Sequence, residues 1–299
     1  METMKKIMLL INPNAGRGGF RLGLADVLQV FHEAGYRSTV FFTDGRGDAT
    51  ELAAEHAAEY DRVVCVGGDG TLSETISGLM LCPERPSLGY IPMGTTNDVA
   101  ATLRLSHIPA AAARTAVRGR ARPLDVGLFN DSEYFTYVAA FGAFTEVAYE
   151  TPQPQKQALG RLAYFLSGIA ALGHLTHRTA KVEWDGGTVE GDFIFGGVTN
   201  SRSVAGLVRL RDVDEDALSD GEFEVLLVRT PMAAGELATA ISEIMANKFS
   251  GDQVILLRSK FVRFTFDEPA PWTRDGEPGG EHTVVTCRNL PSAIRIVTD

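Results

Sequence analysis

A short stretch that begins at Val63 combines the residue types that phosphate chemistry needs. The apolar, β-branched run 63–66 is typical of a buried strand, and Gly67-Gly68-Asp69-Gly70 follows it directly. Apolar residues then recur at helical spacing, namely Leu72, Ile76, Leu79 and Met80. The pattern therefore predicts a strand, a glycine turn and a helix. Glycines let backbone N–H groups approach a ligand, and a helix start adds N–H donors and partial positive charge, so this turn suits a phosphate group.

The aspartate inside this turn, Asp69, indicates a metal as well as a phosphate. A carboxylate would repel a bound phosphate unless a cation lay between the two groups. Mg²⁺ is commonly bound in proteins through one or two carboxylates together with substrate phosphates. The alternative is a plain tight turn in which Asp69 caps the following helix.

Composition narrows the class of protein. A chain of 299 residues allows one large domain or two medium ones, and 44% hydrophobic with 22% charged residues is ordinary for a globular protein. A net charge of −10 disfavours nucleic-acid binding and broad docking on anionic lipid. The three cysteines lack metal-type spacing, and no signal peptide or membrane-length apolar run is present, so we expect a cytoplasmic protein.

The first part of the chain alternates predicted strands and helices up to about residue 127, which indicates a parallel sheet covered on both faces. Ligands bind beyond the carboxyl ends of the strands in such sheets. Thr43, the 67–70 loop and the 94–98 loop all follow strands at that end. This convergence predicts one nucleotide site.

After about Gly127 the pattern changes to a mostly antiparallel β domain. Two helices interrupt it, at about 157–172 and 232–246. The first is apolar enough to line a lipid pocket or touch a membrane, although a core-facing helix is the simpler interpretation. We therefore expect domains at 1–127 and 128–299, with the last strand able to return to the first domain.

Three motifs together carry a resemblance to a known family: 9–16 (Leu-Leu-Ile-Asn-Pro-Asn-Ala-Gly), 66–71 (Val-Gly-Gly-Asp-Gly-Thr) and 89–100, which contains Gly-Thr-Thr-Asn-Asp. In this order and spacing they resemble the catalytic domain of the diacylglycerol and sphingosine lipid kinases, and most of all the bacterial soluble diacylglycerol kinase type. The resemblance implies an N-terminal α/β nucleotide-binding domain, like that of NAD kinases and phosphofructokinases. A C-terminal, mostly antiparallel β-sandwich domain would follow for the lipid substrate.

The resemblance implies an enzyme that transfers the γ-phosphoryl group of ATP to the hydroxyl of a lipid alcohol, with Mg²⁺. The expected acceptor is diacylglycerol or a related lipid, which would involve transient contact with a membrane surface. A homodimer is left open. The rival enzyme is an NAD kinase, which shares the Gly-Gly-Asp-Gly loop. A rival of another class is a non-catalytic regulator that binds nucleotide or lipid.

The family's nucleotide contacts carry over to Thr43, to Thr95 and to the loop formed by Gly67, Gly68, Asp69, Gly70, Thr71, Leu72 and Ser73. The resemblance implies that Asp69 binds the catalytic Mg²⁺, directly or through water. It also implies that Asp98 and Asp125 belong to an acidic network around the same metal. The simpler interpretations are a helix N-cap for Asp98 and a strand-start residue for Asp125.

Two further segments gain a role only from the resemblance. The segment 217–222 is similar to one that binds a second, structural Mg²⁺, with the Asp220 carboxylate and the main-chain oxygens of Ala217 and Glu222 as ligands. The segment 275–277 is similar to the one that carries the general base, which would be Glu277. Prolines and glycines on both sides of Glu277 argue against a compact hairpin at that point.

Overall fold

A computed structural model of the chain describes residues 4–16, 20–95, 97–142, 177–200, 203–204, 208–209, 218–231, 233–246, 248–249 and 252–299. The chain divides into two compact units. The N-terminal unit comprises Met1–Val126 and Pro291–Asp299, and the β unit comprises Gly127–Leu290. Each unit has its own core.

The N-terminal unit is built on a parallel sheet. Its strands are β1 (Lys5–Ile11), β2 (Tyr36–Phe42), β3 (Arg62–Gly67), β4 (Ser87–Pro92) and the end of β15 (Glu277–Thr298). Their order is β15–β4–β3–β1–β2, and neighbouring strands in this order pair in parallel. The last strand of the chain thus completes the first sheet through the pairing of Ile296 with Leu88.

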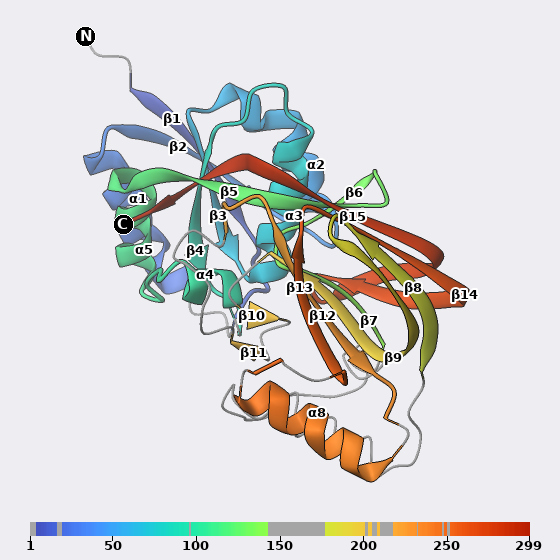
Figure 1. The fold of residues 1–299 in the computed structure, drawn as a ribbon. Helices are drawn as coiled ribbons and strands as arrows, with labels where there is room; N and C mark the ends of the chain where they lie inside the picture. Colours follow the sequence, from blue (N-terminus) through green and yellow to red (C-terminus); the bar gives the residue numbers. More distant parts are fainter. Residues whose placement is uncertain are drawn as a thin grey trace. The chain divides into compact units, whose positions relative to one another are not determined.

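Helices cover both faces of this sheet (Figure 1). Helices α1 (Phe20–Glu33) and α5 (Pro109–Arg118) pack on the face that carries Ile7, Leu9 and Ile11. The opposite face is covered by α3 (Asp69–Met80), which packs against α2 (Asp48–His56) and β3. The apolar positions 72, 76 and 79 of α3 are fully buried, so the predicted helical stripe is the one that faces the core.

Helix α2 starts without a side-chain cap from its own N-cap residue. Gly47 is the N-cap, in a left-handed conformation with φ of 85°, and Asp48 is the first helical residue. The Gly47 N–H donates to Glu74 Oε1 at 2.9 Å, while Asp48 Oδ2 accepts the N–H of Asp44 at 2.8 Å. A side chain of α3 therefore accepts a hydrogen bond from a backbone N–H at the start of α2. Local sequence patterns do not predict this contact.

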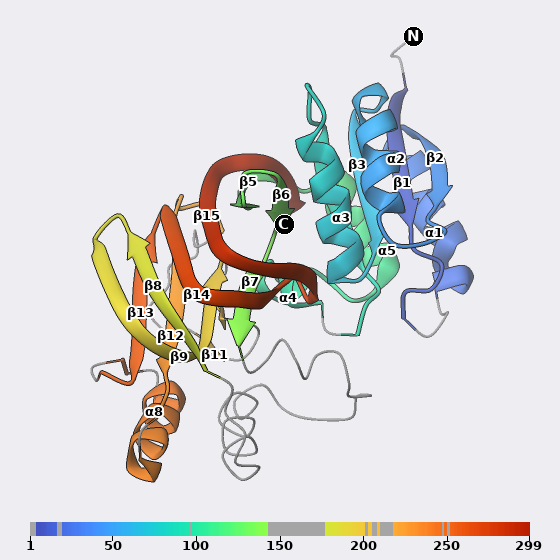
Figure 2. The ribbon, with the colours of Figure 1, turned by 90° about the vertical axis from the view of Figure 1, so that its right-hand side faces the viewer.

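The β unit is an antiparallel structure whose strand pairing closes on itself. Strand β9 (Gly187–Thr199) pairs with β7 (Val138–Gly142) and β8 (Arg178–Trp184), and β14 (Phe261–Arg274) pairs with the same two strands. Beyond this ring, β9 pairs with β12 (Phe223–Arg229) and β12 with β13 (Val254–Ser259), while β14 pairs with β15. The β8–β9 hairpin curves strongly, which lets one long strand serve two layers (Figure 2).

The core of the β unit is aromatic. Phe141, Phe264 and Trp272 are fully buried or nearly so, and the ring centroids of Phe264 and Phe141 lie 5.1 and 5.1 Å from that of Trp272. These side chains come from β7 and β14, so the packing holds the two paired strands together through their faces as well as their hydrogen bonds.

Strand boundaries in the second half depend on the fold and not on local sequence alone. The apolar segment 134–141 is two elements, β6 (Glu133–Phe135) and β7, because the backbone turns at Thr136–Tyr137. The segments 282–287 and 294–297 are parts of the single long strand β15. Strand β5 spans Arg120–Phe129.

Two further helices lie among the described residues. Helix α4 (Asp98–Thr102) follows the loop after β4, and α8 (Ala234–Ala246) matches the helix expected at 232–246. The helix expected over 157–172 lies outside the described residues. No helix in the described ranges is long and apolar enough to cross a membrane.

The packing of α3 on α2 predicts a large effect for Gly78→Ala. A Cβ at Gly78 would lie 2.4 Å from the Thr50 carbonyl oxygen and 2.6 Å from Ala53 Cβ, so α2 would have to move. We expect the free energy of unfolding to fall by about 2 kcal/mol, although alanine favours a helix by about 1 kcal/mol. Gly70→Ala in the same helix meets nothing within 4 Å and is the matched control. Chemical denaturation of both variants measures the difference, and an unchanged stability for Gly78→Ala would contradict this packing.

Candidate active site

Three loops at the carboxyl ends of the parallel strands come into direct contact. A Cβ on Gly16, after β1, would lie 2.6 Å from the Met93 carbonyl oxygen, and one on Gly94 would lie 2.6 Å from Gly68 Cα. The Met93 N–H donates to the Gly67 carbonyl at 2.7 Å. The glycines are therefore required by close approach of backbone to backbone, and they bring the three motif loops to one place.

Asn12 connects the first of these loops to the second. Its Nδ2 group donates to Thr71 Oγ1 at 3.0 Å, and its Oδ1 atom accepts the N–H of Asn14 at 2.9 Å. Thr71 is 8% exposed, so its hydroxyl has a fixed position at the edge of the loop. Because Thr71 Oγ1 accepts this bond, its hydrogen can donate to a ligand. Sequence reasoning did not assign Asn12 this role.

Asp69 joins the second loop to the third. Gly68 is the N-cap of α3, so the interpretation of Asp69 as that helix's cap is wrong. Its carboxylate lies instead at the start of α4: Oδ2 accepts the Asp98 N–H at 3.0 Å and Oδ1 accepts the Val99 N–H at 3.3 Å. A negative charge at a helix N-terminus is favourable, so this carboxylate stabilises the start of α4.

Asn97 fixes the third loop from within. It is 3% exposed and adopts a left-handed conformation, with φ of 52°. Its Oδ1 atom accepts the Gly94 N–H and its Nδ2 group donates to the Gly94 carbonyl, both at 2.8 Å. The Asn97 residue is thus the N-cap of α4, so Asp98 is the first helical residue and not its cap.

The other predicted nucleotide contacts differ in accessibility. Thr95 is exposed in the third loop, whereas Thr43 is 5% exposed at the end of β2, where its N–H donates to the Ile11 carbonyl. Leu72 is fully buried in the core, so only its backbone could face a ligand. Gly70 and Ser73 are partly buried in the first turns of α3, whose N–H groups point toward the loops.

Asp125 ties the first sheet to the returning strand. It is fully buried, and its Oδ1 atom accepts the Ser292 N–H at 2.7 Å. Asp98 is half-buried. Across the described residues, no three His, Cys, Asp or Glu side chains gather closely enough to hold a metal ion by themselves. The carboxylates of Asp69, Asp98 and Asp125 therefore do not form a closed metal-binding group, and their part in binding Mg²⁺ stays a prediction.

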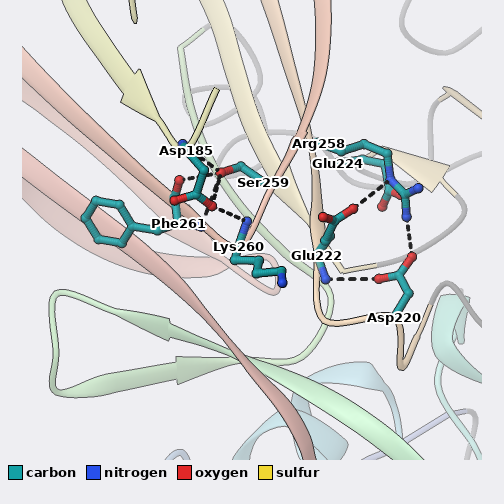
Figure 3. A network of polar contacts seen from close by, with 8 residues as sticks. All are labelled: Asp185, Asp220, Glu222, Glu224, Arg258, Ser259, Lys260 and Phe261. Atoms are coloured by element: carbon teal, nitrogen blue, oxygen red, sulfur yellow. Dashed lines mark hydrogen bonds and ion pairs between the residues drawn. The ribbon is translucent and has the colours of Figure 1, made fainter. Parts of the chain in front are cut away.

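In the β unit, the segment with similarity to a structural metal site carries a cluster of acidic side chains around one arginine (Figure 3). Arg258 forms an ion pair with Asp220, and its Nε atom lies 3.7 Å from Glu222 Oε2 and 3.4 Å from Glu224 Oε1. Asp220 Oδ1 also accepts the Glu222 N–H at 3.0 Å. Ala217 lies outside the described residues, so of the three expected ligands the structure describes Asp220 and Glu222.

Glu224, on β12 beside this cluster, is an unusual carboxylate. Its residue is 1% exposed, and neither side-chain oxygen has a hydrogen-bond partner among the described residues. Burial raises the pKa of Glu224 to about 8; the Arg258 charge lowers this pKa, while Asp220 and Glu222 raise it. Sequence reasoning missed this residue, because a glutamate is rarely fully buried in a strand.

Glu277 follows a tight turn. Arg274 pairs with Glu277 across β14 and β15, and Asp275 and Gly276 between them have φ of 48° and 85°. Two successive positive φ values with Asp-Gly are typical of a two-residue hairpin. The expectation that the flanking prolines and glycines prevent a compact hairpin is therefore wrong, and the Glu277 residue is exposed beside the turn.

The burial of Glu224 predicts a dependence of stability on pH. Because its pKa is raised from 4.5 to about 8 on folding, the folded state keeps a proton that the unfolded state loses in this window. The free energy of unfolding should then fall between about pH 4.5 and pH 8, by up to a few kcal/mol. Glu224→Gln should flatten this decline in metal-free buffer with chelator. Glu183→Gln, a half-exposed glutamate on β8, is the control, and parallel pH profiles for wild type and Glu224→Gln would disprove the assignment.

Comparisons with known proteins give the geometry a context. Residues 6–129 match the diacylglycerol kinase catalytic domain, and residues 139–298 match the YegS C-terminal NAD kinase beta sandwich-like domain. The chain is 36% identical to a diacylglycerol kinase of Bacillus subtilis (strain 168) over 279 residues, 93% of this chain and 91% of that protein. It is 32% identical to a diacylglycerol kinase of Staphylococcus carnosus (strain TM300) over 93% of this chain and 90% of that one.

The fold has a counterpart among solved structures. The crystal structure of a diacylglycerol kinase from Bacillus anthracis str. Sterne superposes with a TM-score of 0.76 at 22% identity, and covers 100% of this chain and 98% of that one. The α/β catalytic domain and the C-terminal β sandwich of the prediction are thereby confirmed. With both domain models and full-length relatives in agreement, the chain belongs to the diacylglycerol kinase family of lipid kinases.

Proposed function

We propose that this protein transfers the γ-phosphoryl group of ATP to the hydroxyl of diacylglycerol or a closely related lipid alcohol. The observation that carries the proposal is the contact of three loops at the carboxyl ends of β1, β3 and β4, tied together by Asp69 and Asn12. Such an arrangement of glycine loops and a helix start suits the phosphates of a nucleotide. The named activity of the relatives in two bacteria gives the lipid acceptor.

In this proposal the N-terminal unit binds the nucleotide. The N–H groups at the start of α3, within 67–73, and the Thr71 and Thr95 side chains hold the phosphates in line, with Thr43 at the end of β2. The Leu72 N–H is not among these donors, because it is bound to the Gly68 carbonyl at 3.0 Å. Phosphoryl transfer requires mainly positioning and electrostatic stabilisation, which rigid loops provide. The buried amide of Asn97 and the Asp69 carboxylate keep these loops rigid.

Mg²⁺, when bound, would offset the charge that develops on the transferred phosphoryl group. Asp69 is the proposed residue that meets the metal or its water, with Asp98 and Asp125 in the surrounding acidic network. A second metal would be bound by the Asp220 carboxylate and the main-chain oxygens of Ala217 and Glu222, where the Asp220 carboxylate now pairs with Arg258.

The β unit supplies the remaining chemistry. We propose that Glu277 accepts the proton of the lipid hydroxyl as its oxygen attacks the γ-phosphorus atom. The β unit would serve as the lipid-substrate domain, and the enzyme would meet its substrate by transient contact of a cytoplasmic protein with the membrane surface. A homodimer is compatible with this proposal.

The direct test is consumption of ATP by the purified protein with diacylglycerol in mixed micelles or with NAD as acceptor. Lipid-dependent ADP release, with no NADP formed, is the expected result. Formation of NADP without lipid phosphate would favour the NAD kinase instead. Nucleotide or lipid binding with no turnover of either acceptor would indicate a non-catalytic regulator.

For Asp69→Asn we expect kcat to fall more than a hundredfold, about 2.7 kcal/mol of activation free energy. An amide keeps one acceptor for the α4 N–H groups but lacks the charge that a cation and a helix terminus need. Asp61→Asn is the control, because Asp61 also accepts a backbone N–H, from Lys6 at 2.7 Å, at the other end of the sheet. Steady-state kinetics and circular dichroism measure both variants; a kcat within tenfold of wild type would contradict a metal role for Asp69.

For Glu277→Gln we expect kcat to fall about a hundredfold, at the low end of general-base effects, because phosphoryl transfer has a loose transition state. Binding of ATP should stay unchanged, since Glu277 is not among the proposed nucleotide contacts. The acid limb of the kcat–pH profile should disappear. Glu281→Gln, an exposed glutamate four residues further along β15, is the control. A large loss of ATP binding in Glu277→Gln would mean that Glu277 has another role.

A further inference from the structure

Asp275 makes an unusual set of contacts at the tip of the β14–β15 hairpin. Its Oδ2 atom accepts the Thr136 N–H at 2.7 Å, and its Oδ1 atom accepts the N–H groups of Tyr137 and Val138 at 2.8 and 2.9 Å. The Asp275 N–H donates to the Val138 carbonyl at 2.8 Å. One turn residue is thus bound four times to the segment that links β6 to β7. Bonds from N–H groups to a carboxylate are among the stronger hydrogen bonds in proteins.

The segment 136–138, which is hydrogen-bonded to Asp275, also makes hydrogen bonds to β9 and the residue that follows it. The Tyr137 carbonyl accepts the Thr199 hydroxyl at 2.9 Å and the Asn200 N–H at 3.0 Å. Both Thr199 and Asn200 are fully buried. The turn is therefore anchored to the interior of the β unit and not to another surface loop.

A second contact fixes the same tip. Arg274 forms an ion pair with Glu133 at 2.5 Å, and its backbone pairs with Ala139 of β7 and with Glu277 of β15. Arg274 also lies over the Phe129 ring, 5.5 Å from its centroid. Glu277 is thus the direct pairing partner of a residue held by β6 and β7, and it is two residues from Asp275.

We propose that Asp275 is a positioning residue for Glu277, and that its carboxylate, together with the Arg274–Glu133 ion pair, sets the place of the base at the hairpin tip. This inference rests on the proposed role of Glu277. A general base must lie within hydrogen-bond reach of the proton that it accepts. An error of about 1 Å in such a group can lower the rate by about a hundredfold. Glu277 is exposed and directly follows the two-residue turn, so the place of its backbone depends on how that turn is held.

The variant Asp275→Asn separates positioning from turn formation. Asn-Gly is as suitable as Asp-Gly for two successive positive φ values, so the hairpin should persist. The amide oxygen can replace part of the carboxylate, but the NH₂ group cannot accept, so the three N–H groups of 136–138 lose at least one partner. The expected kcat is ten- to a hundredfold lower, with the Kd of ATP unchanged.

Two readouts distinguish positioning from a general loss of structure. Hydrogen exchange of the amides of Thr136, Tyr137 and Val138 should be at least about tenfold faster in Asp275→Asn. The acid limb of its kcat–pH profile should remain, because Glu277 is still the base, whereas Glu277→Gln should lose that limb. The double variant should be no more than about threefold slower than Glu277→Gln, because a misplaced glutamine cannot lose the same function twice.

The matched control is Asp185→Asn. Asp185 is also the aspartate of an Asp-Gly turn, between the paired residues Trp184 and Gly187 of β8 and β9, and its Oδ2 atom accepts the Lys260 N–H at 3.0 Å (Figure 3). Its carboxylate accepts hydrogen bonds from the Lys260 N–H and the Ser259 hydroxyl, at a turn that does not lead to Glu277. We expect Asp185→Asn to lose stability to a similar degree while kcat stays within twofold of wild type.

The outcomes separate this inference from the proposed function. Glu277→Gln with wild-type kcat would remove the base and with it the reason for positioning. A hundredfold loss in Glu277→Gln with wild-type kcat in Asp275→Asn would overturn the inference alone, as would additive effects in the double variant. If Asp275→Asn does not fold, Glu133→Ala takes its place: a lower kcat at unchanged ATP affinity supports the positioning role, and an unchanged kcat contradicts it.

Discussion

The Asp69 carboxylate is the contact on which the proposed nucleotide site most depends. Neighbouring parallel strands end at the same edge of a sheet, but their loops diverge unless something joins them. Asp69 lies at the end of the loop after β3, and its carboxylate accepts hydrogen bonds from two N–H groups of α4. Helix α4 follows the loop after β4. With Gly68 against Gly94, the two loops form one backbone surface. Charge at this position therefore serves the protein's own helix as well as the proposed cation.

The β unit contains a similar interaction between an aspartate carboxylate and backbone N–H groups. Asp275, like Asp69, is an aspartate of a glycine turn whose carboxylate satisfies backbone N–H groups of a neighbouring segment. In both units a short turn carries a functional side chain, and a charged acceptor fixes the turn to buried structure. Loops that bind and react are usually mobile, so this kind of anchoring supplies the rigidity that phosphoryl transfer needs.

The sequence predicted most of the first unit and less of the second for physical reasons. Continuous apolar runs such as 63–66 and helical stripes such as that of α3 reveal a buried parallel sheet, because their periodicity is local. The break between β6 and β7 depends on Asp275, which is more than 130 residues away, so no local pattern could show it. The compact hairpin before Glu277 was missed because prolines beside it suggested an open loop. The buried Glu224 was missed because a glutamate is rarely fully buried, and nothing local marks this one as buried.

The measurement that tests the account most directly is the fate of the γ-phosphoryl group. Purified protein, [γ-³²P]ATP, Mg²⁺ and diacylglycerol in mixed micelles are incubated, and lipid and water phases are separated and counted. The account predicts one labelled lipid phosphate for each ADP released, and no label transfer when the lipid is omitted. Label that appears only as inorganic phosphate, with none in the lipid phase, would contradict it.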